Sequence, residues 1–106
     1  MASNGIKDRV AIVGMGCTPF GEHWDKGADD LLVDAATEAW KSAGVGPDDI
    51  DAYWLGTMGS GVSGLMLSEA LKLQYKPVTR LENMCATGSE AMRNAVALCD
   101  HPDLRR

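Results

Sequence analysis

Short runs rich in β-branched and apolar residues alternate three times along this chain with longer segments of helical periodicity. The runs expected to form strands are RVAIVGMG from residue 9, a stretch centred on residues 50–55, and KPVTRLEN at 76–83. The segments expected to form helices cover residues 28–44, residues 65–74 and the part from about residue 86 onward. This β-α-β-α-β-α order predicts an α/β fold with a mostly parallel sheet and right-handed crossovers.

The first helical segment has the most complete set of local signals. Its apolar stripe consists of Leu32, Ala35, Ala36, Ala39, Trp40 and Ala43. Asp29 or Asp30 can cap the helix start, where a carboxylate also favours the positive end of the helix dipole. Gly44 is expected to end the helix in a left-handed conformation, with Pro47 just beyond.

Length, charge and hydropathy restrict the classes of protein that remain. A chain of 106 residues suits one small domain or part of a larger one. Its net charge of -5 argues against a nucleic-acid partner, because phosphate binding needs a basic surface. No apolar run approaches the roughly 20 residues that cross a bilayer, so no membrane association is expected. The first ten residues lack the order of a secretory signal, which makes a cytoplasmic location the expectation.

The three cysteines, Cys17, Cys85 and Cys99, do not form a disulfide framework, because their number is odd and their spacing irregular. If one helix joins Cys85 and Cys99, their Cα atoms lie about 21 Å apart, whereas a disulfide needs roughly 7 Å or less. No pair of cysteines or histidines has the spacing of a zinc site.

Two glycine-rich stretches and two histidines carry weaker signals. GMGCTP at 14–19 has Pro19 where a dinucleotide-binding fingerprint needs its third glycine, and GSGVSG at 59–64 lacks the Lys-Ser/Thr ending of a phosphate loop. His23 and His101 stand in polar segments with no paired catalytic residue nearby in sequence, so we expect both to be solvated.

Cys85 is the strongest candidate for chemistry. It follows a predicted strand and immediately precedes a predicted helix, where unpaired N–H groups and the positive dipole end favour negative charge on sulfur. The same N–H groups can hold the oxyanion of an acyl intermediate. The residues that follow are small, which leaves room for a substrate carbonyl. The residues alone leave a second interpretation open, that Cys85 is a buried core cysteine.

ENMCATGSEAMRNA, beginning at Glu82, resembles the nucleophile segment of the thiolase superfamily, N-x-x-C-A-S-G-x-x-A. The matching residues are Asn83, Cys85, Ala86, Gly88 and Ala91, while Thr87 replaces the commoner serine. VAIVGMGCTPFGEH and GVGPDDIDAYWLGTM are similar to the first strand and loop, and to the segment leading into the second strand, of the sterol-carrier-protein-type thiolases. The cysteine motif alone is shared with β-ketoacyl synthases, but the three stretches together favour thiolases.

The resemblance implies an acyl-CoA acyltransferase, an acetyl-CoA acetyltransferase or 3-ketoacyl-CoA thiolase, in which Cys85 forms an acyl-cysteine intermediate. Coenzyme A thioesters would be substrates, and no metal or redox cofactor would be required. A β-ketoacyl synthase relative, and a non-catalytic thiolase-like chain with only an assembly role, stay open as alternatives.

The resemblance also implies an incomplete thiolase fold. Thiolases are some four times longer and carry catalytic histidines in a C-terminal half that this sequence does not match. We expect an N-terminal tail at 1–8, a partial N-terminal thiolase domain at 9–99 and a C-terminal tail at 100–106. We also expect the chain to form a homo-oligomer or to need a partner chain, because a small domain buries little of its surface. Alone, it is expected to show no thiolytic turnover.

Overall fold

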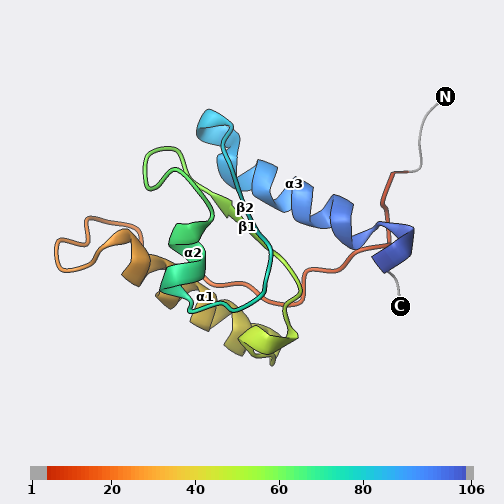
Figure 1. The fold of residues 1–106 in the computed structure, drawn as a ribbon, viewed down its shortest axis with the longest axis horizontal. Helices are drawn as coiled ribbons and strands as arrows, with labels where there is room; N and C mark the ends of the chain where they lie inside the picture. Colours follow the sequence, from red (N-terminus) through yellow and green to blue (C-terminus); the bar gives the residue numbers. More distant parts are fainter. Residues whose placement is uncertain (1–4, 105–106) are drawn as a thin grey trace.

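The computed structural model describes residues 5–104, which form three helices and a two-stranded sheet (Figure 1). The elements are α1 Ala28–Ala43, η1 Pro47–Asp49, β1 Tyr53–Gly56, α2 Leu65–Ala70, β2 Val78–Leu81, η2 Met84–Ala86, α3 Thr87–Cys99 and η3 Pro102–Leu104. The three expected helices and the second and third expected strands are therefore confirmed. The expected tails include residues 1–4 and 105–106, which lie outside the described part of the chain.

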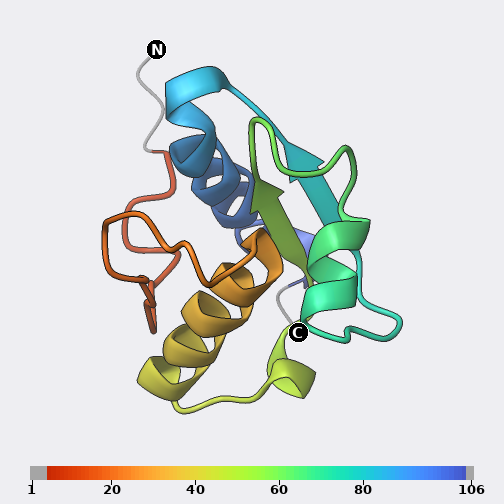
Figure 2. The ribbon, with the colours of Figure 1, turned by 90° about the vertical axis from the view of Figure 1, so that its left-hand side faces the viewer.

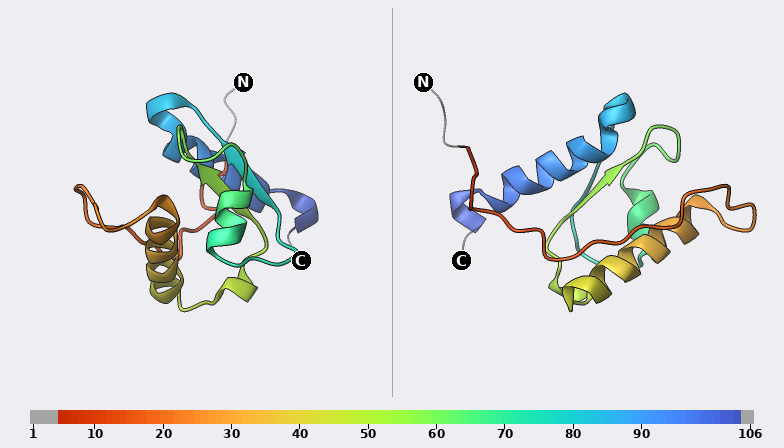
Figure 3. Two further views of the ribbon diagram at one scale, coloured as in Figure 1. Left: turned by 60° about the vertical axis from the view of Figure 1, so that its left-hand side comes forward. Right: turned by 180° about the vertical axis from the view of Figure 1, so that it is seen from behind.

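The sheet is parallel, and its two strands point the same way in Figure 2. Tyr53 pairs with Val78, and Gly56 pairs with Leu81. α3 lies on one face of the sheet, and α1 and α2 lie on the other, so that the sheet forms the middle layer (Figures 1 and 3). This arrangement confirms the α/β class and the parallel sheet predicted from the alternation of elements.

The expected first strand is wrong, because residues 10–19 form no strand in the described chain. The segment runs beside α1 instead, as the red trace shows in Figure 3. Gly16 lies so close to α1 that a Cβ there would be 2.7 Å from the Ala39 nitrogen. The Met15 N–H donates to Ser42 Oγ at 3.4 Å, and Arg9 Nε lies 2.8 Å from Asp100 Oδ1. This segment thus contacts helices and makes no hydrogen bonds of a sheet with other described residues. Its β-branched composition does not distinguish between these two arrangements.

Three other elements are shorter than expected. β2 covers Val78–Leu81 of the expected 76–83, and the other two have local causes. Residues 47–49 form a 3₁₀ turn whose first residue is Pro47, so the following strand begins only at Tyr53. α2 ends at Ala70, and Lys72 adopts a left-handed φ of 54° that stops the helix before the expected residue 74. Gly44 ends α1 with a φ of 72°, as expected.

Asp30 acts at the start of α1 in a different way from the expected N-cap. Gly27 occupies the N-cap position, and its N–H donates to Asp30 Oδ2 at 2.9 Å. Asp30 therefore reaches back from the first turn of the helix, in one half of a capping box, and its charge lies at the positive end of the helix dipole.

The apolar core of the described residues is small. Leu55 and Leu67 are its buried side chains, with exposed fractions of 5% and 6%. Many large apolar side chains face solvent, among them Ile12, Val13, Met15, Phe20, Trp24, Val62 and Tyr75. Within residues 5–104 no helix combines the length and the hydropathy needed to cross a bilayer.

Candidate functional site

Cys85 lies in the turn that joins the end of β2 to the start of α3. It is the central residue of the 3₁₀ turn Met84–Ala86, and α3 begins two residues later at Thr87. Its side chain is exposed and forms no disulfide. The turn is the light-blue end of α3 in Figure 1, away from the C-terminus of the chain. The interpretation of Cys85 as a sealed core cysteine is therefore wrong, and its expected place at a helix start is confirmed.

The hydroxyl of Thr87 closes this turn with two hydrogen bonds. Its oxygen accepts from the Asn83 N–H at 2.9 Å, and its O–H donates to the Met84 carbonyl at 2.7 Å. Thr87 is one of the few buried residues, with an exposed fraction of 8%. A short-range bond from the Ala86 N–H to the Asn83 carbonyl, at 2.9 Å, tightens the same turn.

Met84, which directly precedes Cys85, has a left-handed backbone with a φ of 48°. This conformation costs a non-glycine residue roughly 1–2 kcal/mol and persists only where surrounding contacts hold it. Three such hydrogen bonds exist at this turn. Thr87 accepts the N–H of Asn83 and bonds the Met84 carbonyl, and Glu82 Oε2 accepts the Met84 N–H at 3.0 Å.

The end of β1 supports the turn from the side of the sheet. A Cβ at Gly56 would lie 2.9 Å from Thr87 Cγ2 and 3.0 Å from the Thr87 carbonyl oxygen, so only glycine allows α3 to approach the strand this closely. The first turn of α3 is thus fixed by the sheet as well as by its own hydrogen bonds.

The hydrogen bonds by which Thr87 and Glu82 hold the turn are not evident from the sequence. In the motif, Thr87 stands out only as a departure from serine, and that substitution keeps the hydroxyl. The retained hydroxyl two residues after the cysteine is the one signal in the sequence, since Ser and Thr often bond local backbone groups at helix starts.

Glu90, in the first turn of α3, pairs with Arg93. The Arg93 Nε donates to Glu90 Oε2 at 2.9 Å, and Arg93 Nη2 bonds Oε1. Hydrogen bonding from Arg93, together with its charge, holds the pKa of Glu90 below its ordinary value of 4.5. Because the folded pKa is the lower one, this pair stabilises α3 at pH values above 4.5, and the contribution disappears as pH falls through the folded pKa.

We therefore expect the helical signal of the protein to weaken on acidification below about pH 4.5, and Glu90→Gln to remove part of this dependence. Circular dichroism at 222 nm, followed against pH for the parent protein and the variant, measures it. Asp103→Asn, which changes a carboxylate outside α3, is the matched control. Identical acid profiles for the parent and Glu90→Gln would contradict the assignment.

Neither histidine is brought to the cysteine. His101 follows the end of α3, so it lies about 20 Å from the start of that helix, at 1.5 Å per residue. His23 lies in the loop before α1, with its Nε2 2.7 Å from the Pro19 carbonyl oxygen. That loop and the turn before α3 are well separated in Figures 1 and 2. His101 is exposed, as expected, whereas His23 is partly buried.

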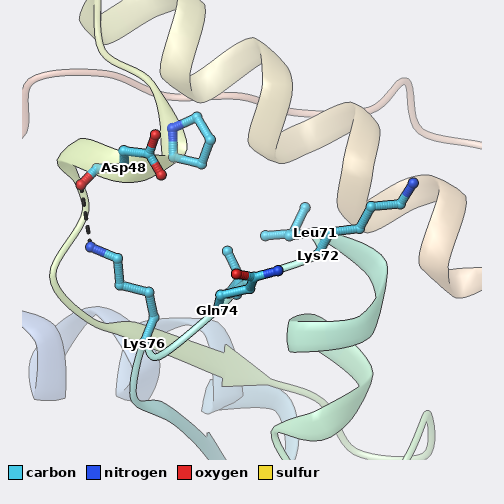
Figure 4. Close-up of a pocket in the computed structure, with 7 residues that line it drawn as sticks. Asp48, Leu71, Lys72, Gln74 and Lys76 are labelled. Atoms are coloured by element: carbon cyan, nitrogen blue, oxygen red, sulfur yellow. Dashed lines mark hydrogen bonds between the residues drawn. The ribbon is translucent and has the colours of Figure 1, made fainter.

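A cavity of 160 Å³ lies at the opposite end of the sheet (Figure 4). Its walls include Asp48, before β1, and Lys76, before β2, which places it at the amino ends of the strands. Lys76 Nζ donates to the Asp48 carbonyl at 3.2 Å. Cys85 is at the carboxyl ends, where ligands of open α/β sheets bind. This cavity is therefore separate from the candidate site.

Comparison with known proteins agrees with this arrangement. The sequence matches the family "Thiolase, N-terminal domain" over residues 10–101. It is 39% identical over 93 residues to the acetyl-CoA acetyltransferase of Methanocaldococcus jannaschii, and 36% identical over 94 residues to that of Methanothermobacter thermautotrophicus. Each match covers 82% of this chain and 24% of the relative, so the chain spans about a quarter of the length of these relatives.

Together, the fold and the matches define an α/β domain of the thiolase class. This chain belongs to the thiolase family, and its residues 10–101 match the N-terminal domain of that family.

Proposed function

We propose that the protein acts as a thiolase-type acyl-CoA acyltransferase in which Cys85 accepts the acyl group. The observation that carries the proposal is the exposed Cys85 at the start of α3, within a chain of the thiolase family. The names of the two relatives, both acetyl-CoA acetyltransferases, support an acyl-CoA thioester as the donor.

The proposed first step is a thioester exchange. The Cys85 thiol gives its proton to solvent, and the resulting thiolate attacks the carbonyl carbon of the acyl-CoA. A new carbon–sulfur bond forms, the bond to the CoA sulfur breaks, and the departing CoA thiolate takes up a proton from solvent. In this proposal, N–H groups at the start of α3 stabilise the developing oxyanion, and the helix dipole adds a favourable field. A Cβ at Gly88 would meet no atom within 4 Å, so there is open space on this turn of the helix.

In this proposal the reaction needs no metal or redox cofactor, because the chemistry is an exchange between thiols. The proposed location is the cytoplasm. Three free and exposed cysteines support a reducing compartment, since such thiols are oxidised readily elsewhere.

The proposal includes a further protein surface, either a second copy of this chain or a partner chain. Support comes from the small core and from the many large apolar side chains that face solvent, because covering such side chains with a partner surface is favourable. We expect either that a partner chain co-purifies with the protein or that sedimentation of the purified protein shows self-association. A monomer with a single cooperative thermal transition would contradict this part of the proposal.

The test of the function is the release of CoA from acetyl-CoA, followed with a thiol reagent. We expect about one equivalent of CoA per chain and then no steady turnover, since neither histidine of this chain reaches the sulfur to act as a base. An acyl carrier protein thioester in place of acetyl-CoA tests the β-ketoacyl synthase alternative. No CoA release from acetyl-CoA, or acyl transfer only from the carrier-protein thioester with release of the carrier's own thiol, would contradict the proposal.

A further inference from the structure

We propose that Thr87 is a positioning residue that presents the Cys85 sulfur to the acyl donor, an inference that rests on the function proposed above. Thr87 does not reach the acyl group in this proposal. It acts through the backbone of the turn. Its hydroxyl oxygen accepts the N–H of Asn83, and its O–H donates to the carbonyl of Met84.

The mechanical link runs through Met84. A left-handed φ at this residue, 48°, sets the direction in which the chain leaves the turn and therefore the direction of the next side chain, that of Cys85. An unbranched L-residue leaves this conformation readily unless neighbouring bonds hold it. Thr87 bonds the Met84 carbonyl at 2.7 Å and is itself buried, with an exposed fraction of 8%, so water does not compete effectively for that bond.

The two parts of the Thr87 side chain have separate partners. The hydroxyl holds the turn, whereas the methyl group faces the end of β1, where a Cβ on Gly56 would lie 2.9 Å from it. Thr87→Val keeps the shape and removes the hydroxyl. Thr87→Ser keeps the hydroxyl and removes the methyl group. These two variants therefore separate positioning of the sulfur from packing on the sheet.

The readout is the rate of alkylation by iodoacetamide at Cys85 relative to Cys99, measured by peptide mapping on the same molecules. Cys99 is exposed at the other end of α3, so it corrects for reagent, pH and global unfolding. We expect Thr87→Val to lower this ratio about tenfold, in line with the loss of two hydrogen bonds that hold a disfavoured backbone. Thr87→Ser should stay within about twofold of the parent ratio.

A second variant tests the route through the backbone. Glycine adopts a positive φ without penalty, so Met84→Gly in the Thr87→Val background should restore most of the lost ratio. A parent-like ratio in Thr87→Val, or a loss in Thr87→Ser, would overturn the inference, and so would a folded double variant without recovery. If Thr87→Val fails to fold, Thr87→Ala, which also removes the hydroxyl, takes its place, and a parent-like ratio in that variant would overturn the inference.

The same experiment separates this inference from the proposed function. If Cys85 of the parent protein reacts no faster than Cys99, the proposed nucleophile fails, and the inference about Thr87 fails with it. If Cys85 reacts faster in the parent and equally fast in Thr87→Val, only the role of Thr87 is lost.

Discussion

Replacing Cys85 by alanine is expected to abolish capture of an acetyl group from acetyl-CoA. Among the residues that the structure describes, Cys85 is the one exposed cysteine in the turn that leads into α3. The loss should be complete rather than partial, because covalent capture needs the nucleophile itself. Release of CoA, measured with a thiol reagent, gives the result directly.

Cys99→Ala is the matched control for this variant. Both cysteines are exposed and belong to or adjoin α3, but Cys99 is its last residue, where the dipole disfavours negative charge. We expect Cys99→Ala to capture acetyl groups as the parent does. Equal losses in both variants would mean that the cysteines react without regard to their place on the helix, which contradicts the proposed role of the helix start.

Gly16→Ala is expected to have the largest effect on the fold. A Cβ at this position would lie almost on the backbone of α1, 2.7 Å from the Ala39 nitrogen and closer still to the Ala35 carbonyl oxygen. Because backbone atoms of a helix cannot move aside, the segment at 10–19 must leave α1, at a cost of about 3 kcal/mol. Faster hydrogen exchange at the Met15 amide, which bonds Ser42, would report this release.

The control for the glycine variant is Gly59→Ala, where a Cβ would meet no atom within 4 Å. We expect this change to leave exchange in the segment at 10–19 as in the parent. If Gly16→Ala also left it unchanged, the close contact between the segment and α1 would not exist in solution.

Sequence patterns suffice to predict the elements whose signals are local. α1 has an apolar stripe and the stop at Gly44, and α3 follows a strand and a turn that ends in small residues, so both are located within a residue or two. The parallel pairing of β1 and β2 follows from their order around a helix. The position of Cys85 follows from the strand–turn–helix pattern, with no knowledge of its neighbours in space.

The remaining features depend on contacts that a sequence pattern does not encode. The β-branched run near residue 12 has the composition of a buried strand, but Gly14 and Gly16 let it lie against α1. The left-handed backbone at Met84 is unusual for that residue type and exists because Thr87 and Glu82 bond its peptide groups. The first contact joins residues far apart in the sequence, and the second depends on a backbone conformation that the residue types do not specify, so neither is evident from the sequence pattern.

The most direct test of the proposed nucleophile is the location of the acetyl group after brief exposure to acetyl-CoA. Peptide mapping by mass spectrometry distinguishes the three cysteines, Cys17, Cys85 and Cys99, all exposed in the structure. We expect one acetyl group per chain, on the peptide that contains Cys85. Acetyl groups spread evenly over the three cysteines, or absent from Cys85, would contradict its role as the acyl acceptor.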